Sequence, residues 1–214
     1  ARAGAAVAPR GYFEVHATLD APPHGPVVVV AREADIDNTE ISDFYRFGVA
    51  NAAEIYSMQP PSLYKAQNYW NRMEHRALEG FVCAIAPFNF CALGANLLGM
   101  PALMGNSVVF KPSSTAIHES YFMMKILKEA GLPDGVVNFV PCRGSTMGNT
   151  ILPHKDLAGV NFTGSTGTFH TIWKDVAQHI DEYKSYPRLI GETGGKNFHF
   201  VHESADMTSV INQT

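Results

Sequence analysis

Short apolar runs alternate with longer stretches of mixed polarity through most of this chain. The apolar runs predict strands at residues 81–86, 107–110, 136–140, 159–162 and 188–191, with 197–201 as one more candidate. The stretches between them predict helices at residues 92–104, 115–130, 144–151 and from 163–166 to about Tyr183. Pro101 is expected to break the first of these helices. Strands that are apolar throughout and alternate with helices indicate an α/β fold, a parallel sheet with helices on both faces.

The part before residue 81 is patterned differently. Residues 41–56 fit a helix with a broad buried face, residues 37–40 offer capping side chains at its start, and Pro60 and Pro61 end it. Residues 62–76 are polar and aromatic and predict an extended connector. Strand-like patterns at 12–19 and 27–31 are separated by a proline-rich break, which favours an edge hairpin or an irregular arm.

Composition narrows the class of protein. The chain has 214 residues, of which 46% are hydrophobic and 17% charged, as in ordinary packed domains. The net charge is −4 and the basic residues are scattered, so neither nucleic acid nor an anionic membrane surface is expected as a partner. No apolar stretch is long enough to predict a membrane span.

The cysteines and the first residues bear on the compartment. Cys83, Cys91 and Cys142 match no metal-binding spacing, and an odd number favours a reducing environment over a disulfide framework. Residues 1–10 are rich in small residues, contain arginine and lack acids, which is faintly like an organelle transit segment. The alternative is that the chain begins partway through a longer protein.

The candidate chemistry lies where the predicted strands end. In parallel α/β sheets, ligands bind beyond the carboxyl ends of the strands. The residues expected there are Asn89, Lys111, Gly144, Gly164, Ser165 and Glu192. Lys111 is either a solvated lysine or a hydrogen-bond donor to a ribose or phosphate. Asn89 makes either a buried structural hydrogen bond or one to a developing oxyanion.

Two glycine-containing turns leave similar alternatives. Gly164 and Ser165 precede a helix whose free N–H groups favour an anion such as a pyrophosphate, although Ser165 or Thr166 also suits an ordinary helix cap. Glu192 precedes a Gly-Gly pair, so it is either a solvated acid at a turn or a carboxylate that faces a cleft. Neither a G-x-G-x-x-G fingerprint nor a P-loop is present.

Four motifs, in this order and at these intervals, resemble the NAD(P)-dependent aldehyde dehydrogenase superfamily. They are Phe88-Asn89-Phe90, Lys111-Pro112-Ser113, Phe162-Thr163-Gly164-Ser165 and Glu192-Thr193-Gly194-Gly195-Lys196. Four other stretches are similar to its 1-pyrroline-5-carboxylate dehydrogenase branch: residues 43–47, 78–82, 101–106 and 195–202. The resemblance implies a Rossmann-like NAD(P)-binding domain of aldehyde dehydrogenase type over residues 33–214, with residues 1–32 as an irregular arm that is not family-like.

The resemblance also implies roles for individual residues. For the cofactor, Lys111 would bind the adenosine ribose, with Ser113 and Ser114 beside it, and Gly164 and Ser165 would meet the pyrophosphate. Gly144 and Phe162 would line the adenine side. For the chemistry, Asn89 would donate to the thiohemiacetal oxyanion, and Glu192 would be the general base for the water that hydrolyses the thioester.

Two departures from the family pattern have consequences. Many members carry an acid at the position of Ser114, where it binds the ribose hydroxyls and repels a 2′-phosphate. The resemblance with this serine implies NAD as the cofactor, with NADP tolerated. Phe169 stands where other branches have a glycine, which is shared with the pyrroline-carboxylate branch and implies a shifted helix.

The resemblance places the nucleophilic cysteine, the catalytic domain and the C-terminal oligomerisation strand beyond Thr214. Cys83 is expected in a buried strand, Cys142 on the adenine side and Cys91 packed at a helix start, so all three are poor substitutes for the nucleophile. This stretch alone is therefore expected to be inactive, because hydride transfer needs the thiolate. Apolar surface near Phe198 and Phe200 is expected to be exposed and to promote self-association.

Three functional hypotheses remain. The first is NAD(P)-dependent oxidation of L-glutamate γ-semialdehyde to L-glutamate in proline catabolism, by a homo-oligomeric full-length enzyme in the mitochondrial matrix of a eukaryote or the cytoplasm of a bacterium. The second is a truncated, non-catalytic form that binds a nucleotide or associates with full-length subunits. The third is another aldehyde dehydrogenase branch with a different aldehyde substrate.

Overall fold

A five-stranded parallel sheet forms the centre of the molecule. The computed structural model describes residues 4–8, 12–17, 27–62 and 70–213. The strands, in spatial order β6-β5-β4-β7-β8, are β6 (Val137–Phe139), β5 (Ser107–Lys111), β4 (Phe81–Ile85), β7 (Leu157–Gly164) and β8 (Arg188–Thr193). All four pairings are parallel. The predicted α/β class and parallel sheet are confirmed.

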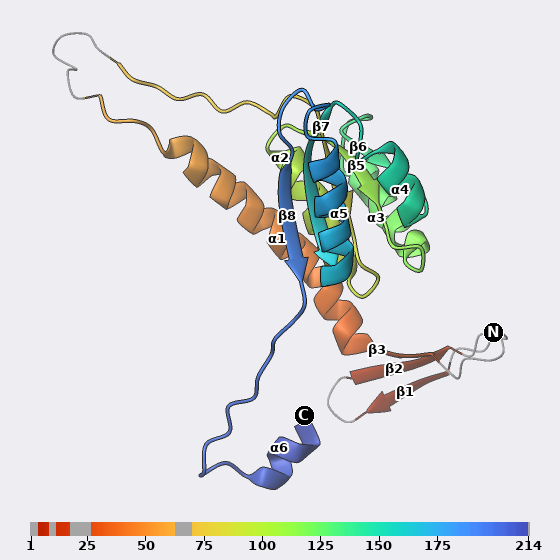
Figure 1. The fold of residues 1–214 in the computed structure, drawn as a ribbon. Helices are drawn as coiled ribbons and strands as arrows, with labels where there is room; N and C mark the ends of the chain where they lie inside the picture. Colours follow the sequence, from red (N-terminus) through yellow and green to blue (C-terminus); the bar gives the residue numbers. More distant parts are fainter. Residues whose placement is uncertain (1–3, 9–11, 18–26, 63–69, 214) are drawn as a thin grey trace.

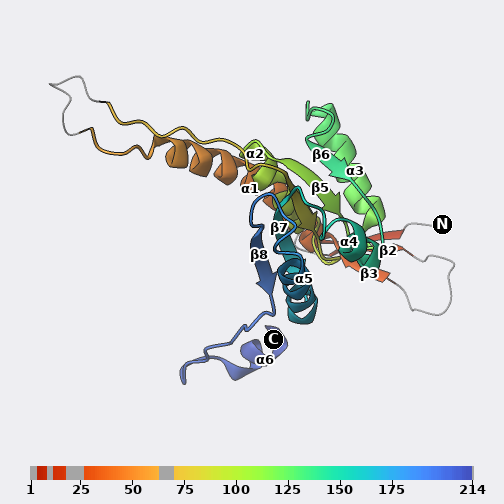
Figure 2. The same cartoon turned by 45° about the horizontal axis from the view of Figure 1, so that its top comes forward.

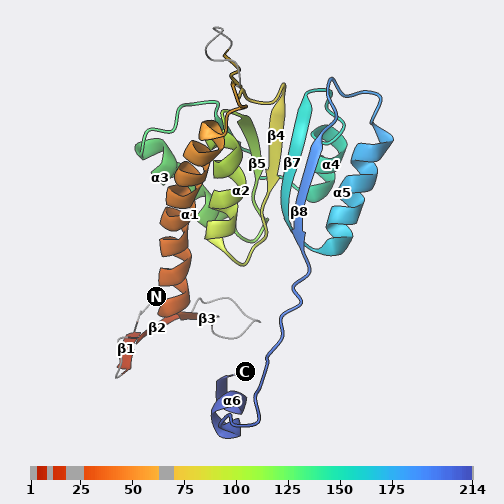
Figure 3. The same ribbon diagram turned by 90° about the vertical axis from the view of Figure 1, so that its left-hand side faces the viewer.

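Helices cover this sheet on both faces, as Figure 3 shows. On one face lie α1 (Ala31–Ser57), α2 (Cys91–Leu103) and α3 (Ile117–Glu129). On the other lie α4 (Gly144–Thr150) and α5 (Thr166–Gln178). Successive residues of β4 alternate between the two cores: Cys83 and Ile85 pack with α4 and α5, whereas Ala84 packs with α2. This alternation explains why the central strand is apolar throughout.

Helix α1 begins earlier than expected. The sequence predicted a helix over 41–56 capped by residues 37–40, but α1 runs from Ala31 to Ser57 and residues 37–40 lie within it. The carboxylate of Asp37 caps a different helix: it accepts hydrogen bonds from the backbone N–H groups of Cys91 and Ala92, at 2.9 and 2.7 Å. The sequence predicted that residues 37–40 cap their own helix, and it gave no sign of this partner more than fifty residues away.

Pro101 does not break α2. The helix continues to Leu103, because the backbone carbonyl of Leu97, which loses its usual donor to the proline, accepts a hydrogen bond from Nδ2 of Asn161 at 2.9 Å. This donor comes from β7. The expected break is wrong because a side chain from the sheet replaces the missing N–H group.

Two further expectations near the C-terminus are corrected. Helix α5 ends at Gln178, short of Tyr183, and residues 197–201 form no strand. Instead, an irregular segment leaves β8 and leads to a short helix, α6 (Met207–Gln213), which the sequence pattern did not predict (Figure 1). Among the described residues, no helix has both the length and the apolar character needed to cross a bilayer.

The N-terminal part forms a second, antiparallel sheet. Its strands are β1 (Gly4–Ala8), β2 (Tyr12–Ala17) and β3 (Val27–Val30), in the order β1-β2-β3. Strands β2 and β3 correspond to the hairpin alternative, while residues 18–26 lie outside the described residues. Strand β1 was not expected.

An extended ribbon follows α1, which confirms the predicted connector for its described residues, 62 and 70–76 (Figures 1 and 2). Its two arms are joined across the ribbon by the side chain of Gln59, which bonds both backbone groups of Met73, and by Ser62 with Asn71. Residues 63–69 lie outside the described part of the chain.

Candidate functional site

The strand ends bring several predicted site residues to one edge of the sheet. Ile85 of β4 pairs with Lys111 on one side and with Phe162 on the other. One strand further along, Thr163 pairs with Glu192. The chain turns from β4 towards β5 and β6 and later returns to β7 on the other side of β4. Parallel sheets bind ligands beyond the carboxyl edge at such a reversal.

A cavity of about 330 Å³ opens at this edge, between the end of β5 and helices α4 and α5. Lys111 and Gly144 line it, so the structure brings together these two predicted cofactor residues. A Cβ atom at Gly144 would meet no atom of another part of the chain within 4 Å, which leaves this wall open to a ligand. Its remaining lining residues are Ile85, Ser145, Met147, Gly148, Asn149, Leu152, Thr168, Thr171, Ile172 and Asp175.

Sequence reasoning missed the polar residues that α5 contributes to this cavity. Thr168, Thr171 and Asp175 are spaced three and four residues apart, so they share one face of the helix. Ile172 and Val176 of the same helix are buried in the core. This polar stripe beside an apolar one was visible in the sequence and marks the face that lines the cavity.

Ser165 serves as the N-cap of α5. Its hydroxyl oxygen accepts a hydrogen bond from the backbone N–H of Thr168 at 3.2 Å. The ordinary capping alternative is therefore confirmed for its side chain. The helix start also lies beside Gly194, which adopts a φ of +63° and where a Cβ atom would lie 3.0 Å from Oγ1 of Thr166. The turn after Glu192 thus packs directly against the start of α5.

Phe162 does not line the cavity. It is only 3% exposed and belongs to the core beneath α4 and α5. The ring of Phe169 stacks on it, with centroids 5.7 Å apart, and also covers Gly191, where a Cβ atom would lie 2.5 Å from that ring. The ring of Phe162 also reaches along β7 to Gly164, where a Cβ atom would lie 2.7 Å from its Cζ. The adenine contact of Phe162 stays a prediction.

Ser113 and Ser114 lie in the turn that follows β5. The hydroxyl of Ser113 is hydrogen-bonded to that of Thr115 at 3.1 Å, and Ser114 is exposed. Neither residue lines the cavity, although both lie directly beyond Lys111, which does.

Asn89 and Glu192 are both exposed at this edge. Asn89 lies in the turn between β4 and α2, and its side chain forms no hydrogen bond within the described residues. The alternative of a buried structural amide is therefore wrong. Glu192 lies on β8, next to the strand β7 that leads into Gly164 and Ser165. Both polar groups are open to a ligand or to water.

The cysteines lie away from this edge or are protonated. Burial raises the pKa of the Cys83 thiol to about 12. The pKa of the Cys91 thiol is also raised to about 12, mainly by burial and to a smaller extent by a hydrogen bond with Glu119. Cys142 is half-buried against the core under α4 and α5. Neither Cys83 nor Cys91 is therefore poised as a thiolate nucleophile.

Residues 28–214 match the family model described as the aldehyde dehydrogenase family. The chain belongs to the aldehyde dehydrogenase family. It is 52% identical over 183 residues to "Delta-1-pyrroline-5-carboxylate dehydrogenase, mitochondrial" of Danio rerio, and 51% identical over 183 residues to the protein of the same name of Homo sapiens. Each alignment covers 85% of this chain and 32% of the relative, so the chain spans about a third of the length of these relatives.

A solved structure gives the same picture. The fold is similar to that of the delta-pyrroline-5-carboxylate dehydrogenase from Mycobacterium tuberculosis bound with NAD, with a TM-score of 0.76 and 47% sequence identity. The match covers 81% of this chain and 32% of that one. The five-stranded sheet and its helices thus match the Rossmann-like fold of this aldehyde dehydrogenase.

Proposed function

We propose that this chain forms the NAD-binding part of a 1-pyrroline-5-carboxylate dehydrogenase. The full-length enzyme oxidises L-glutamate γ-semialdehyde to L-glutamate in proline catabolism. The observation that carries this proposal is the identity of about half of all residues, over 183 positions, with dehydrogenases of this name. The cavity at the carboxyl edge of the sheet supports it, because it holds a lysine and an open glycine where a dinucleotide would bind.

The residues around the cavity fit the cofactor. Lys111 donates hydrogen bonds to the adenosine ribose from the end of β5, and Gly144 leaves room for the adenine side. The start of α5, behind Gly164 and Ser165, presents backbone N–H groups to the pyrophosphate. Ser113 and Ser114 border the ribose. NAD, when bound, accepts the hydride.

Two exposed residues serve the chemistry at the same edge. The amide of Asn89 donates a hydrogen bond to the oxyanion that develops at the carbonyl oxygen of the aldehyde. The carboxylate of Glu192 accepts a proton from the water that hydrolyses the acylated enzyme. The nucleophilic cysteine is supplied from outside residues 1–214, since Cys83 and Cys91 are protonated and Cys142 is packed against the core.

The environment of the three cysteines favours a second candidate function for the chain by itself. Cys83 and Cys91 are protonated and Cys142 is packed against the core, so residues 1–214 by themselves bind a nucleotide without forming the covalent intermediate. A chain that binds NAD and shows no aldehyde oxidation fits this non-catalytic form, whereas oxidation by a full-length protein that contains it fits the enzyme.

Calorimetric titration of NAD tests the cofactor site directly. We expect the chain to bind NAD, and Lys111→Ala to weaken the affinity roughly 10- to 100-fold, as the loss of a charged hydrogen bond predicts. Lys125→Ala is the matched control, because this exposed lysine lies on α3 and does not line the cavity. Equal affinity of the chain and Lys111→Ala would contradict the assigned role of Lys111.

The same titration with NADP addresses cofactor choice. Ser114 is exposed where an acid would repel a 2′-phosphate, so we propose that NADP binds more weakly than NAD but measurably.

We further propose that the full-length enzyme forms homo-oligomers. The mitochondrial names of the relatives support a matrix location for a eukaryotic source, with the cytoplasm for a bacterial one.

A further inference from the structure

Helix α2 starts without a cap of its own. Its N-cap residue is Phe90, whose side chain has no oxygen, and no capping hydrogen bond comes from that residue. The first N–H groups of a helix have no partner within the helix and are normally satisfied by a nearby Ser, Thr, Asp or Asn. In α2 this partner comes from α1, more than fifty residues earlier in the chain.

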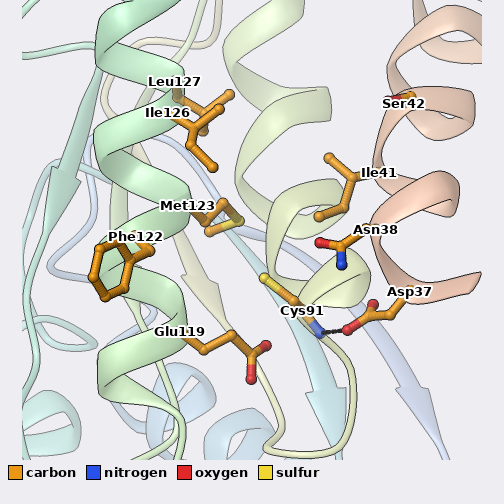
Figure 4. Close-up of a pocket in the computed structure, with 10 residues that line it drawn as sticks. All are labelled: Asp37, Asn38, Ile41, Ser42, Cys91, Glu119, Phe122, Met123, Ile126 and Leu127. Carbon is orange, nitrogen blue, oxygen red and sulfur yellow. Dashed lines mark hydrogen bonds between the residues drawn. The ribbon is translucent and has the colours of Figure 1, made fainter. Parts of the chain in front are cut away.

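Asp37 supplies both oxygens of its carboxylate to this helix start. Oδ2 accepts from the N–H of Cys91 at 2.9 Å, and Oδ1 accepts from the N–H of Ala92 at 2.7 Å. Figure 4 shows the contact with Cys91. Charge-assisted hydrogen bonds of this kind are stronger and more directional than those between neutral groups. A carboxylate at a helix N-terminus also interacts favourably with the helix dipole.

The capped turn is the one that carries Asn89. Asn89 is two residues before Cys91, in the bend between β4 and α2. Asp37 satisfies the helix start, and the amide of Asn89 forms no hydrogen bond in the described part of the chain. It therefore stays available at the carboxyl edge of the sheet.

We propose that Asp37 is a positioning residue for Asn89: it ties the turn before α2 to α1 and so holds the Asn89 amide in place for the oxyanion. This inference rests on the proposed function, in which Asn89 is the donor. Asp37 touches neither substrate nor cofactor and acts only through the backbone of Cys91 and Ala92.

Further contacts between α1 and α2 support this tie. The hydroxyl of Tyr45 donates a hydrogen bond to the carbonyl oxygen of Ala95 at 3.1 Å, and its ring lies directly on Gly99. Further along, Gly48 faces the side chain of Met100. Asp37 thus extends a close helix pair to the first turn of α2. Tyr45→Phe offers a matched control, because it removes one hydrogen bond between the same helices away from Asn89.

The test is steady-state kinetics of the full-length enzyme that contains this chain. We expect Asn89→Ala to lower kcat roughly 100-fold, and Asp37→Ala to lower it roughly 10- to 100-fold, since a displaced donor loses most of its effect. Asp37→Asn keeps one acceptor oxygen and should fall between Asp37→Ala and the wild type. The affinity for NAD should change less than twofold in each. Tyr45→Phe should lower thermal stability and leave kcat unchanged.

The double variant Asp37→Ala/Asn89→Ala separates positioning from general destabilisation. If Asp37 acts through Asn89, the double variant is no slower than Asn89→Ala alone. If the two effects multiply, or if Tyr45→Phe lowers kcat as much as Asp37→Asn does, the proposal is overturned. Should Asp37→Ala fail to fold, the Asp37→Asn cycle gives the same decision. A wild-type enzyme that binds NAD but oxidises no aldehyde would overturn the proposed function, and this inference with it.

Discussion

The amide of Asn161 decides whether Pro101 is tolerated within α2. The carbonyl of Leu97 would otherwise be an unpaired acceptor between the helix and the sheet, because proline has no N–H group to donate. A side chain on β7 therefore satisfies a helix that its own sequence would interrupt. The hydrogen bond from Asn161 thus compensates for the proline and links β7 to α2.

We predict that Asn161→Leu destabilises the chain by about 1–3 kcal/mol, because it leaves this acceptor unpaired. In a Pro101→Ala background the cost should be clearly smaller, since an alanine in place of the proline restores a backbone N–H for Leu97. Urea unfolding of the four chains in the cycle measures both values. An identical cost in the two backgrounds would show that the hydrogen bond to Leu97 is not what Asn161 contributes.

Helices α1 and α2 approach closely because Gly99 of α2 has no side chain. At Gly99, a Cβ atom would lie 2.3 Å from Cε1 of Tyr45, so the ring of α1 occupies the space of a side chain. At Gly94, on the same helix, a Cβ atom would lie 3.4 Å from Cζ of Phe110, which is ordinary contact. A side chain at Gly99 would therefore clash with Tyr45, whereas Gly94 has room for a methyl group.

Gly99→Ala should destabilise the chain by about 1–3 kcal/mol, as overpacking of a close contact does. Gly94→Ala is the matched control and should be neutral or stabilise by up to about 1 kcal/mol, because alanine favours the helix and its methyl group fits. Thermal unfolding followed by circular dichroism compares the two. Equal destabilisation would mean that loss of backbone freedom or crowding at Phe110, rather than the ring of Tyr45, governs both sites.

The molecule as a whole leaves apolar groups uncovered beyond its sheet. The segment after β8 runs away from the body towards α6 (Figure 1) and carries Phe198 and Phe200, each 85% exposed. Their predicted exposure is confirmed. Ile190 of β8 is 63% exposed as well. Neighbouring exposed apolar side chains favour association, because contact removes them from water.

We predict that the chain self-associates at concentrations on the order of tens of micromolar, through this segment. Sedimentation velocity should show a shift towards monomer in Phe198→Ser/Phe200→Ser. Phe47→Ser, which removes one exposed aromatic ring from α1, should not change the distribution. A wild-type chain that sediments as a single monomeric species would refute the prediction.

The central strands and most helices could be predicted from local pattern, because buried strands are apolar throughout and helix ends carry local signals. Gly131, with a φ of +102°, directly follows the C-cap residue of α3, a position where glycine is typical. The placement of Lys111, Asn89 and Glu192 at one edge also followed from the order of strands and loops. Strand 197–201 was wrong because apolar alternation alone does not supply a neighbouring strand to pair with.

By itself, the sequence determined the α/β class, the parallel order of elements and the residues at the strand ends, since these depend on periodicity and on near neighbours. Only the tertiary structure decided that Asp37 caps α2, that Asn161 supports Pro101 and that the ring of Tyr45 packs on Gly99. In each case the partner lies far away in the chain, and a hydrogen bond or a packing contact forms only after the fold brings the two residues together.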